Sequence, residues 1–504
     1  MHKSNGLKIM LTNPAVKEKI DDKKERYFIK AGSRWPWSYI KRINEECVPP
    51  FPFYLAYSAQ ILRNEGFDVY TLDGVALNME KPVFIEKVLT VAPDVLVIET
   101  AAHAFMHDVN LAKELKSKLS SNLKIIFTGP HATTFANEIM LNYPHIDIVL
   151  RGEYEFLLLE VVKRLQNNDN LRIDGVAYRD NGNLVVSGKK GFIEDINKLP
   201  YPAFELFPSE EAPDITRYGD GICTYKPAVT LHSSRGCPFK CNFCLWNQVM
   251  YDNRKYRMFS PERVVDEMCY VIENFGAKEI YFDDDDFCIN KKHVVDICDE
   301  IKARKLKIKW SCMGDAISTD EEMLKVMAEA GCIFMKFGVE SGNKDILRQM
   351  GKPLEPLKAI QTAEICRKYG IMTHATFVFG LYGDTMDSMR ETLALANKIK
   401  FDYAQASIAT PLPGTRLYDL LIDSGRIKDM DFNNFDGTRS CVVLSEHLSP
   451  QQVVAFRKKA IKSMVLHKMA DPIWWRNFIR RNAILYKEYG HEKVFSPIYT
   501  LFNL

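Results

Sequence analysis

Short apolar segments alternate with helical patterns along most of the chain, in two separate runs. The second run holds six strand candidates, Val229–His232, Glu279–Phe282, Ile308–Cys312, Ile333–Val339, His374–Phe379 and Gln405–Ala409. Such alternation is typical of parallel strands joined by crossover helices. Six units over ~190 residues fall short of the eight-fold barrel, which needs about 250 residues. The pattern therefore predicts a partial (β/α)6 barrel over residues 223–435.

Three cysteines follow the first strand of this run directly. They are Cys237, Cys241 and Cys244, in a C-x3-C-x2-C spacing. Active sites of such barrels lie at the carboxyl ends of the strands, and thiolates are the soft ligands that hold iron–sulfur clusters. A zinc site or chance clustering is the alternative, but zinc sites usually take two ligand pairs, and no second pair follows. The spacing favours a four-iron cluster with one iron left open.

The first run, over residues 1–195, predicts a Rossmann-like α/β domain. Its strand candidates are Leu7–Asn13, Asp68–Leu72, Val95–Glu99, Ile125–Thr128 and Ile146–Leu150. No G-x-G-x-x-G follows the first strand, so a dinucleotide is not favoured. Ligands of such sheets bind at the carboxyl ends of the strands. The candidate cofactor-binding residues are therefore those at the strand ends: Asn13, Thr100, Ala101, Gly129, Pro130, His131, Gly152 and Glu153.

Two resemblances follow from these residues. The cysteine motif with its Gly-Cys-Pro lead-in resembles the radical S-adenosylmethionine (SAM) superfamily. The stretches Thr12–Pro14, Val97–Thr100, Phe127–His131 and Leu150–Glu153 resemble the cobalamin-binding domain that precedes many radical SAM enzymes. The resemblance implies three cofactors: a [4Fe-4S] cluster on the cysteines, SAM on its open iron, and cobalamin on the first domain.

One departure from the cobalamin-binding pattern concerns the lower face of the cobalt. The motif D-x-H-x-x-G, whose histidine binds cobalt, is absent after the first strand. The resemblance then implies cobalamin bound without a histidine from that motif. His103 and His131 lie on predicted strand-end loops and could approach the corrin, or they have no metal role.

The resemblance also assigns contacts with SAM. Phe243 would pack near the adenine, and Gly380, in the loop after the fifth strand, would pass it. Asp284 and Asp285, from the acidic run 283–286, would accept hydrogen bonds from the SAM ammonium group. A solvated loop is the alternative for this run. Glu340 and Ser341, in the run Phe337–Gly342, would contact the ribose or the amino acid part.

The implied activity is cobalamin-dependent methylation of an unactivated carbon. In methylases of this class one SAM methylates cobalamin, and a second is cleaved to the 5′-deoxyadenosyl radical that activates the substrate. Radical ring formation or rearrangement, as in the anaerobic porphyrin-ring cyclase, is the alternative. A cobalamin- or redox-sensing binding protein is a more remote one. The expected partners are a small-molecule or lipid-like substrate and an electron donor of the flavodoxin or ferredoxin type.

Three other segments carry weaker signals. Residues 196–222, rich in turns and prolines, predict a linker. An insertion over residues 14–53 contains Arg34, Trp35 and Trp37, which either line a pocket or form a surface flap. Residues 436–504 predict a C-terminal helical cap. Its aromatic and basic stretch Ile473–Arg481 would cap the barrel, touch a lipid-like substrate, or lie at a membrane surface.

Charge and hydropathy set the remaining expectations. Lys and Arg number 67 and Asp and Glu 65, so the net charge of +2 gives no reason to expect nucleic acid. No uninterrupted apolar stretch reaches spanning length, and the N-terminus carries no signal-peptide core. Twelve scattered cysteines do not form a secreted disulfide scaffold. We therefore expect a cytoplasmic protein without a transmembrane segment.

Overall fold

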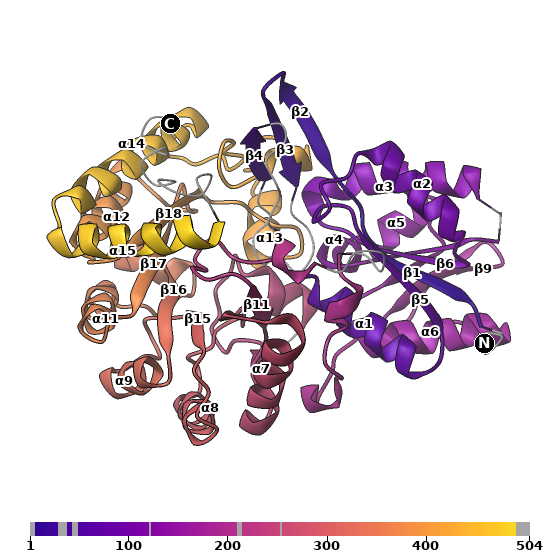
Figure 1. The fold of residues 1–504 in the computed structure, drawn as a ribbon. Helices are drawn as coiled ribbons and strands as arrows, with labels where there is room; N and C mark the ends of the chain where they lie inside the picture. The colour runs from indigo at the N-terminus through magenta and orange to yellow at the C-terminus, as the bar shows by residue number, and fades with distance from the viewer. Residues whose placement is uncertain are drawn as a thin grey trace.

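The computed structural model describes residues 6–28, 38–42, 49–119, 122–208, 214–251 and 255–489. Two α/β units lie side by side, the N-terminal one in indigo and purple and the second in magenta to yellow (Figure 1). Arg34, Trp35 and Trp37 lie outside the described residues, so the role predicted for them stays a prediction.

The N-terminal unit is a doubly wound sheet with the strand order β10-β9-β8-β7-β6-β1-β5. Helices α1 and α6 pack on one face, and α2, α3 and α5 pack on the other. The five parallel strands match the predicted ones to within two residues, because each is a buried apolar run. The elements are β1 (Lys8–Asn13), α1 (Phe53–Asn64), β5 (Asp68–Asp73), α2 (Lys81–Val91), β6 (Val95–Glu99), η1 (Ala102–Ala104), α3 (Phe105–Lys118), β7 (Lys124–Thr128), α4 (Pro130–Thr134), α5 (Ala136–Asn142), β8 (Ile148–Leu150), α6 (Glu155–Asn167), β9 (Val176–Asp180) and β10 (Asn183–Val186).

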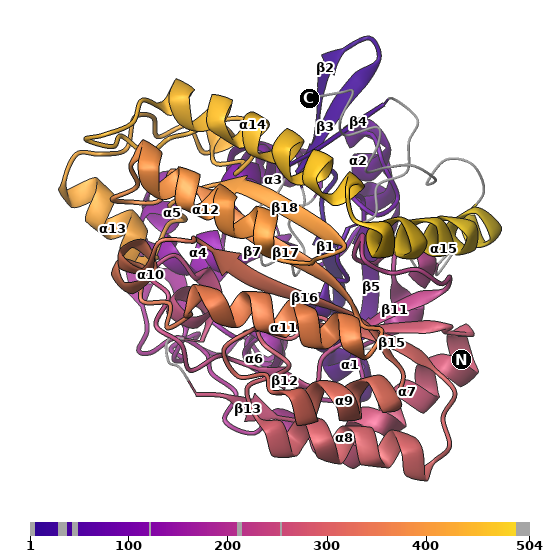
Figure 2. The same cartoon turned by 90° about the vertical axis from the view of Figure 1, so that its left-hand side faces the viewer.

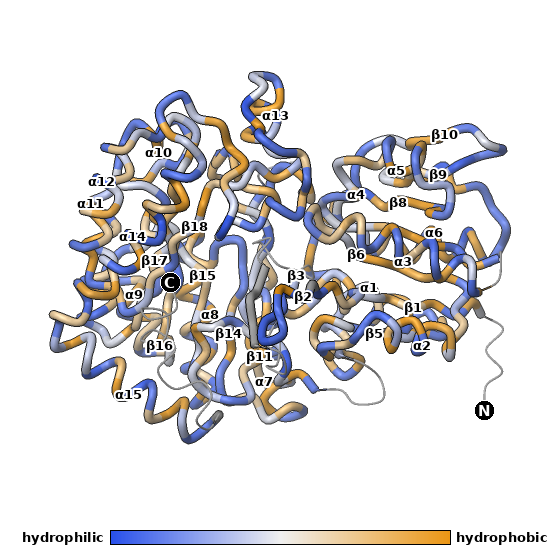
Figure 3. Tube along the Cα trace, turned by 90° about the horizontal axis from the view of Figure 1, so that it is seen from above, coloured by the Kyte–Doolittle hydropathy of each residue, from blue (hydrophilic) through white to orange (hydrophobic). Residues whose placement is uncertain are grey.

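A small antiparallel sheet occupies part of the predicted insertion. It is formed by β2 (Lys17–Asp21), β3 (Lys24–Phe28) and β4 (Ser38–Arg42), and it projects beside the junction of the two units (Figure 1). The sequence did not predict these strands, because β2 and β3 are rich in charged residues and have no apolar run. Figure 3 shows the hydrophilic character of the turn that joins them.

The second unit is a sheet of six parallel strands in chain order, β11-β14-β15-β16-β17-β18, with helices on its outer side. This is the partial barrel expected from the sequence. Its elements, with a two-stranded ribbon β12–β13 beside the cysteine loop, are β11 (Ala228–Leu231), β12 (Ser234–Arg235), η5 (Trp246–Met250), β13 (Arg257–Met258), α7 (Pro261–Phe275), β14 (Glu279–Phe282), α8 (Lys291–Ala303), β15 (Lys309–Gly314), α9 (Glu321–Glu329), β16 (Cys332–Glu340), α10 (Lys344–Gln349), α11 (Pro356–Lys368), β17 (Met372–Phe379), α12 (Met386–Lys398), β18 (Tyr403–Ile408), α13 (Arg416–Asp423) and η6 (Phe432–Asn434).

The predicted linker is packed into the protein interior. It forms three short turns, η2 (Ile196–Lys198), η3 (Phe204–Leu206) and η4 (Ile215–Arg217). The Phe204 ring lies 5.0 Å from that of Phe51, and Phe207 is fully buried beside them. One continuous cluster of buried apolar residues therefore runs from the N-terminal sheet into the barrel.

Two helices, α14 (Pro450–Met469) and α15 (Pro472–Tyr489), complete the described chain. They follow one another along one side of the molecule, α14 beside β17 and β18 (Figure 2). Helix α15 crosses the amino ends of the barrel strands: Trp474 Nε1 donates to the Asp402 carbonyl (2.8 Å), and Arg481 Nη2 donates to the Gly221 carbonyl (2.9 Å). No helix in the described ranges is both long and apolar enough to cross a membrane.

Candidate active site

The three predicted cluster ligands lie on one loop, between β12 and η5, at the carboxyl end of β11. Cys237, Cys241 and Cys244 are each partly buried, and none is in a disulfide. Burial raises the pKa of the Cys244 thiol to about 12, so a cation is needed to hold it as a thiolate. Three free thiols on one loop fit an iron–sulfur cluster as donors. They do not fit an activated nucleophile.

Two amide side chains that the sequence analysis did not single out hold the backbone of this loop. Asn247 Oδ1 accepts from the Cys237 amide (3.2 Å), and its Nδ2 donates to the Cys237 carbonyl (2.7 Å). Gln248 Nε2 lies 3.2 Å from the Cys241 carbonyl oxygen and 2.7 Å from that of Cys244. Both residues lie on the π-helical turn η5 directly after the third cysteine. The Asn-Gln pair three and four residues after the third cysteine is the sequence signal that could have revealed them.

The acidic run after β14 braces the start of the cysteine loop. Asp284 is fully buried, and its carboxylate accepts from the Ser233 amide (2.7 Å) and the Ser234 hydroxyl (2.6 Å). Asp285 accepts from the amide of Gly236, which precedes the first cysteine (2.7 Å). These contacts favour a supporting role over the solvated-loop alternative. The predicted contact of these residues with SAM stays a prediction.

A carboxylate pair that the sequence did not single out lies beside the loop. Asp286, after β14, lies beside Asp315, after β15. Burial, and then the charge of Asp315, raise the pKa of Asp286 well above its ordinary value. Asp315 Oδ2 is buried without a hydrogen-bond partner in the structure.

Strand β16 ends in a strained glutamate. Glu340 has a φ of 65°, which residues with a Cβ rarely adopt, and strain of this kind clusters at functional sites. Its Oε1 lies 3.0 Å from Lys352 Nζ, while its Oε2 is buried without a hydrogen-bond partner. A Cβ at Gly338 would lie 2.9 Å from Lys352 Nζ, so glycine leaves room for this ion pair.

The other predicted SAM contacts have structural roles in the fold. Ser341 is buried, and its hydroxyl lies 3.2 Å from that of Thr392 on α12. Gly380 has a φ of 75°, and a Cβ there would lie 2.6 Å from a methyl group of Val453 on α14. Phe243 is partly buried against the apolar cluster that includes Leu381. Their contacts with SAM stay predictions.

The predicted cobalamin residues lie along one edge of the N-terminal sheet. They follow β1, β6, β7 and β8, which are neighbours in the strand order. Gly129 has a φ of 94°, and a Cβ there would lie 2.7 Å from the Thr100 carbonyl, so two strand-end loops pass closely. Asn13 is buried, with Nδ2 donating to Asp73 (3.0 Å) and no partner for Oδ1. The residues brought together at this edge are Asn13, Thr100, Ala101, Gly129, Pro130, His131 and Gly152.

The two histidines considered for the cobalt are buried. The His131 ring centroid lies 4.3 Å from that of Phe105 and 4.8 Å from that of Phe135. Burial, followed by the charge of His103, lowers the pKa of His131 to about 3, so its imidazole is neutral. A neutral imidazole is the form that binds metals, but aromatic rings surround this one. Ligation of the cobalt stays a prediction.

Glu153 lies in an ion-pair network that joins the two units. Its Oε1 is 3.0 Å from Arg235 Nη1, and its Oε2 is 2.6 Å from Arg257 Nη1. Arg235 Nη1 also lies 2.7 Å from Glu155 Oε1. All four side chains are at most 5% exposed, and both arginines flank the cysteine loop on β12 and β13. The geometry thus gives Glu153 a role as interdomain ion-pair partner, which the sequence did not predict.

Further contacts bring the carboxyl edge of the sheet against the cysteine loop. Thr133, on α4, lies with Oγ1 3.9 Å from the Met250 sulfur on η5. Tyr54, on α1, stacks on Trp246 with ring centroids 5.6 Å apart. The edge expected to bind cobalamin and the loop expected to bind the cluster therefore face one another.

Comparisons with known proteins agree with this geometry. A model of the radical SAM superfamily matches residues 231–396, and a model of the B12-binding domain matches residues 49–162. The chain is 31% identical over 451 residues to the uncharacterized methyltransferase PH0819 of Pyrococcus horikoshii, covering 89% of this chain and 95% of that protein. It is 26% identical over 403 residues to the anaerobic magnesium-protoporphyrin IX monomethyl ester cyclase of Cereibacter sphaeroides, covering 76% and 62%.

A solved structure shares the fold. The radical SAM methyltransferase TsrM of Kitasatospora setae, with cobalamin and a [4Fe-4S] cluster bound, superposes with a TM-score of 0.65 at 15% identity, covering 92% of this chain and 89% of that one.

The chain belongs to the cobalamin-dependent radical SAM enzymes. It carries the radical SAM barrel behind a B12-binding domain, and its cofactors are those of that class: the [4Fe-4S] cluster, SAM and cobalamin. The expectations for family, fold class and cofactors are confirmed.

Proposed function

We propose that this enzyme methylates an unactivated carbon of a small-molecule or lipid-like substrate. The observation that carries the proposal is the apposition of the two cofactor edges, held by the buried network of Arg235, Glu153 and Glu155. When bound, the cluster supplies the electron that cleaves SAM, and cobalamin carries the methyl group. Because the two edges face one another, one substrate site could lie between the cluster and cobalamin. This arrangement supports methyl transfer over a sensing role.

The chain's own residues would orient SAM and hold the reacting groups away from water. Glu340 offers a buried, unpartnered carboxylate oxygen, which suits the vicinal hydroxyls of a ribose. Asp315 offers a second acceptor for the SAM ammonium group, in addition to the predicted Asp285. The ammonium group of Lys352, paired with Glu340, would face the carboxylate of SAM. Each role follows from charge complementarity.

The relatives support a methyltransferase. Besides PH0819, the chain is 24% identical over 427 residues to the cytidylyl-2-hydroxyethylphosphonate methyltransferase of Streptomyces wedmorensis. The similarity to the anaerobic cyclase supports ring formation as the second candidate.

We also propose an electron donor of the flavodoxin or ferredoxin type and a reducing, cytoplasmic setting. Eleven cysteines without a disulfide in the described chain support that setting.

The test is an anaerobic assay of the enzyme reconstituted with iron, sulfide and cobalamin. SAM and a strong reductant are added, and 5′-deoxyadenosine and S-adenosylhomocysteine are quantified together. Formation of both, with a 14-dalton gain on a methylated product, supports the proposal. Deoxyadenosine with a product of unchanged carbon count supports ring formation instead. There are two matched controls. A Cys237→Ala variant should form neither product, and enzyme without cobalamin should retain deoxyadenosine formation without methyl transfer.

A further inference from the structure

The helices α14 and α15 concentrate positive charge in a chain that is nearly neutral overall. Between Pro450 and Glu488 the sequence has nine Lys and Arg residues but two acids, Asp471 and Glu488. Both acids are paired with bases from other elements: Asp471 with Arg367 (2.7 Å) and Glu488 with Lys278 (2.9 Å). The helices therefore present a surface whose charge their own acids do not compensate.

Most of these bases face solvent. Lys468 and Arg481 are buried and Arg457 is partly so, which leaves six exposed bases on the two helices. The exposed ones are Lys458, Lys459, Lys462, Arg476, Arg480 and Lys487. Three of them lie on each helix, and each Lys or Arg near an anionic bilayer surface adds to the attraction to its lipid headgroups.

Large apolar side chains are exposed among these bases. Leu466 is 61% exposed, Ile479 62% and Tyr486 50%. Met469 and Ile473, at the junction of the two helices, are also exposed. Of the fifteen exposed large apolar residues in the described chain, five lie on these two helices. Apolar groups beside basic ones suit the boundary between headgroups and acyl chains, where helices lie in the plane of the bilayer.

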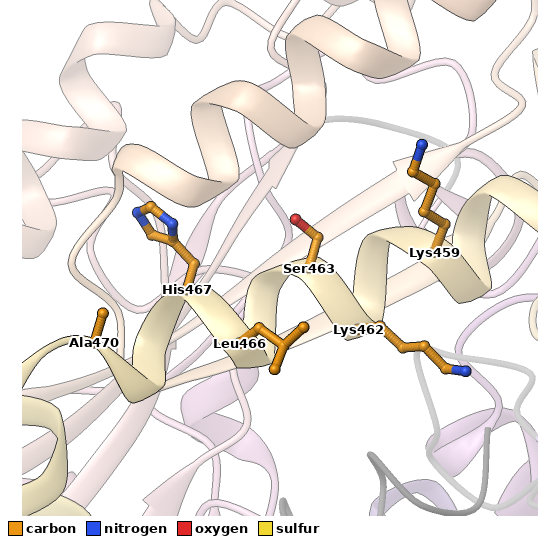
Figure 4. A pocket seen from close by; sticks show the side chains of 6 residues that line it. All are labelled: Lys459, Lys462, Ser463, Leu466, His467 and Ala470. Carbon is orange, nitrogen blue, oxygen red and sulfur yellow. The ribbon is translucent and has the colours of Figure 1, made fainter.

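A surface hollow of about 500 Å³ runs along the second half of α14. It is lined by Lys459, Lys462, Ser463, Leu466, His467 and Ala470, whose side chains Figure 4 shows. In Figure 4, Lys459, Ser463 and His467 project to one side of the helix, where an ammonium group, a hydroxyl and an imidazole provide donors that bind a phosphate. Lys462 and Leu466 project to the other side. The hollow thus has the chemistry of a phospholipid headgroup site.

We propose that α14 and α15 dock the enzyme on an anionic bilayer, with a headgroup phosphate in the hollow on α14. Leu466, Met469 and Ile473 would enter the interface around it. Nucleic acid would be attracted by the same bases but would leave the apolar side chains exposed. An acidic electron-donor protein bound to α15 would lie at the amino ends of the strands, opposite the cysteine loop.

The test is sedimentation of the full-length reconstituted enzyme with vesicles of phosphatidylcholine containing 30% phosphatidylglycerol. Binding should be strong at low salt, weaken as salt rises, and be lost on pure phosphatidylcholine. One basic residue contributes about 1 kcal/mol near such a surface, so Lys459→Gln/Lys462→Gln should lower the partition coefficient about 25-fold. Leu466→Ser/Ile479→Ser should lower it as well.

The matched control is Lys113→Gln/Lys124→Gln, two exposed lysines of the N-terminal unit, which should bind vesicles as the parent does. All variants should keep the parent's melting temperature and its rate of SAM cleavage without lipid. Equal binding to zwitterionic vesicles, or no loss in the α14 lysine variant, overturns the proposal. Tighter binding of a 30-nucleotide RNA than of the vesicles, dependent on the lysines but not on Leu466, overturns it in favour of nucleic acid.

Discussion

The buried network between the two units makes the substitution Arg235→Met a sharp test of the structure. Arg235 is 1% exposed and lies 3.0 Å from Glu153 Oε1 and 2.7 Å from Glu155 Oε1. Its guanidinium also lies over the ring of Tyr54, 4.7 Å from the centroid. Removing one partner from a buried ion pair leaves an uncompensated charge and costs about 3–5 kcal/mol. We expect a loss of this size in the free energy of unfolding at pH 7.

The same substitution should have a characteristic dependence on pH. Burial raises the pKa of Glu155, and Arg235 is the largest influence that opposes this shift. Without Arg235, the pKa of Glu155 in the folded state rises further above the pKa of Glu155 in the unfolded chain. The stability lost in Arg235→Met should be largest at neutral pH, because Glu155 is ionised in the unfolded chain there. The loss should shrink as the pH falls toward the pKa of Glu155 in the unfolded chain.

Urea unfolding at pH 7 and pH 5 measures both effects. Addition of Glu155→Gln should recover part of the stability lost in Arg235→Met, because it removes the stranded charge. Arg235→Lys, which keeps the charge but not the forked geometry, should lose less than Arg235→Met. A loss below about 1 kcal/mol at pH 7, or an equal loss at both pH values, would refute the reasoning, because such a result is typical of an exposed pair.

Three further outcomes can be measured separately. Cys237→Ala should fold but form no 5′-deoxyadenosine; formation at the parent rate would rule out the cluster assignment. Gln248→Ala removes the hydrogen bonds to the Cys241 and Cys244 carbonyls, so cluster affinity should fall about 10-fold or more, read as iron per protein against a Gln166→Ala surface control. Burial raises the pKa of Glu267 from 4.5 to about 8, so its neutralisation should stabilise the fold above pH 8 by up to about 5 kcal/mol. The advantage of Glu267→Gln in thermal unfolding should fade toward pH 4.5, and a constant advantage would contradict the assignment.

The elements that could be predicted from the sequence are those with a local signal. The parallel strands are buried on both faces, so each appears as an apolar run, and β14 (Glu279–Phe282) was predicted with its observed bounds. The cysteine loop could be placed because its spacing and its position after a strand agree. The small sheet β2–β3–β4 could not be predicted, because its charged strands contain no apolar run.

Side-chain partnerships were beyond the sequence because they join distant segments. Glu153 lies 82 residues from Arg235 and 104 from Arg257, and no local pattern links them. The acidic run 283–286 could be placed at the strand end, but its four carboxylates could not be assigned individually. Their roles depend on which carboxylate oxygens accept hydrogen bonds from the Ser233 and Gly236 amides, and on which carboxylate lies beside Asp315. The left-handed backbone of Glu340 is likewise a consequence of its tertiary setting.

The aromatic packing of the segment between the two units has a consequence for how the enzyme works. Phe204 and Phe207 anchor that segment against Phe51, in a cluster that continues into both sheets. Interfaces that are large and apolar do not act as hinges. The spacing between the sheet edge expected to bind cobalamin and the loop expected to bind the cluster is therefore set when the polypeptide folds. Successive reactants must then exchange without a change in that spacing. For protein engineering, cutting the chain here would expose aromatic surface on both halves, so the enzyme should be expressed and evolved as a single body.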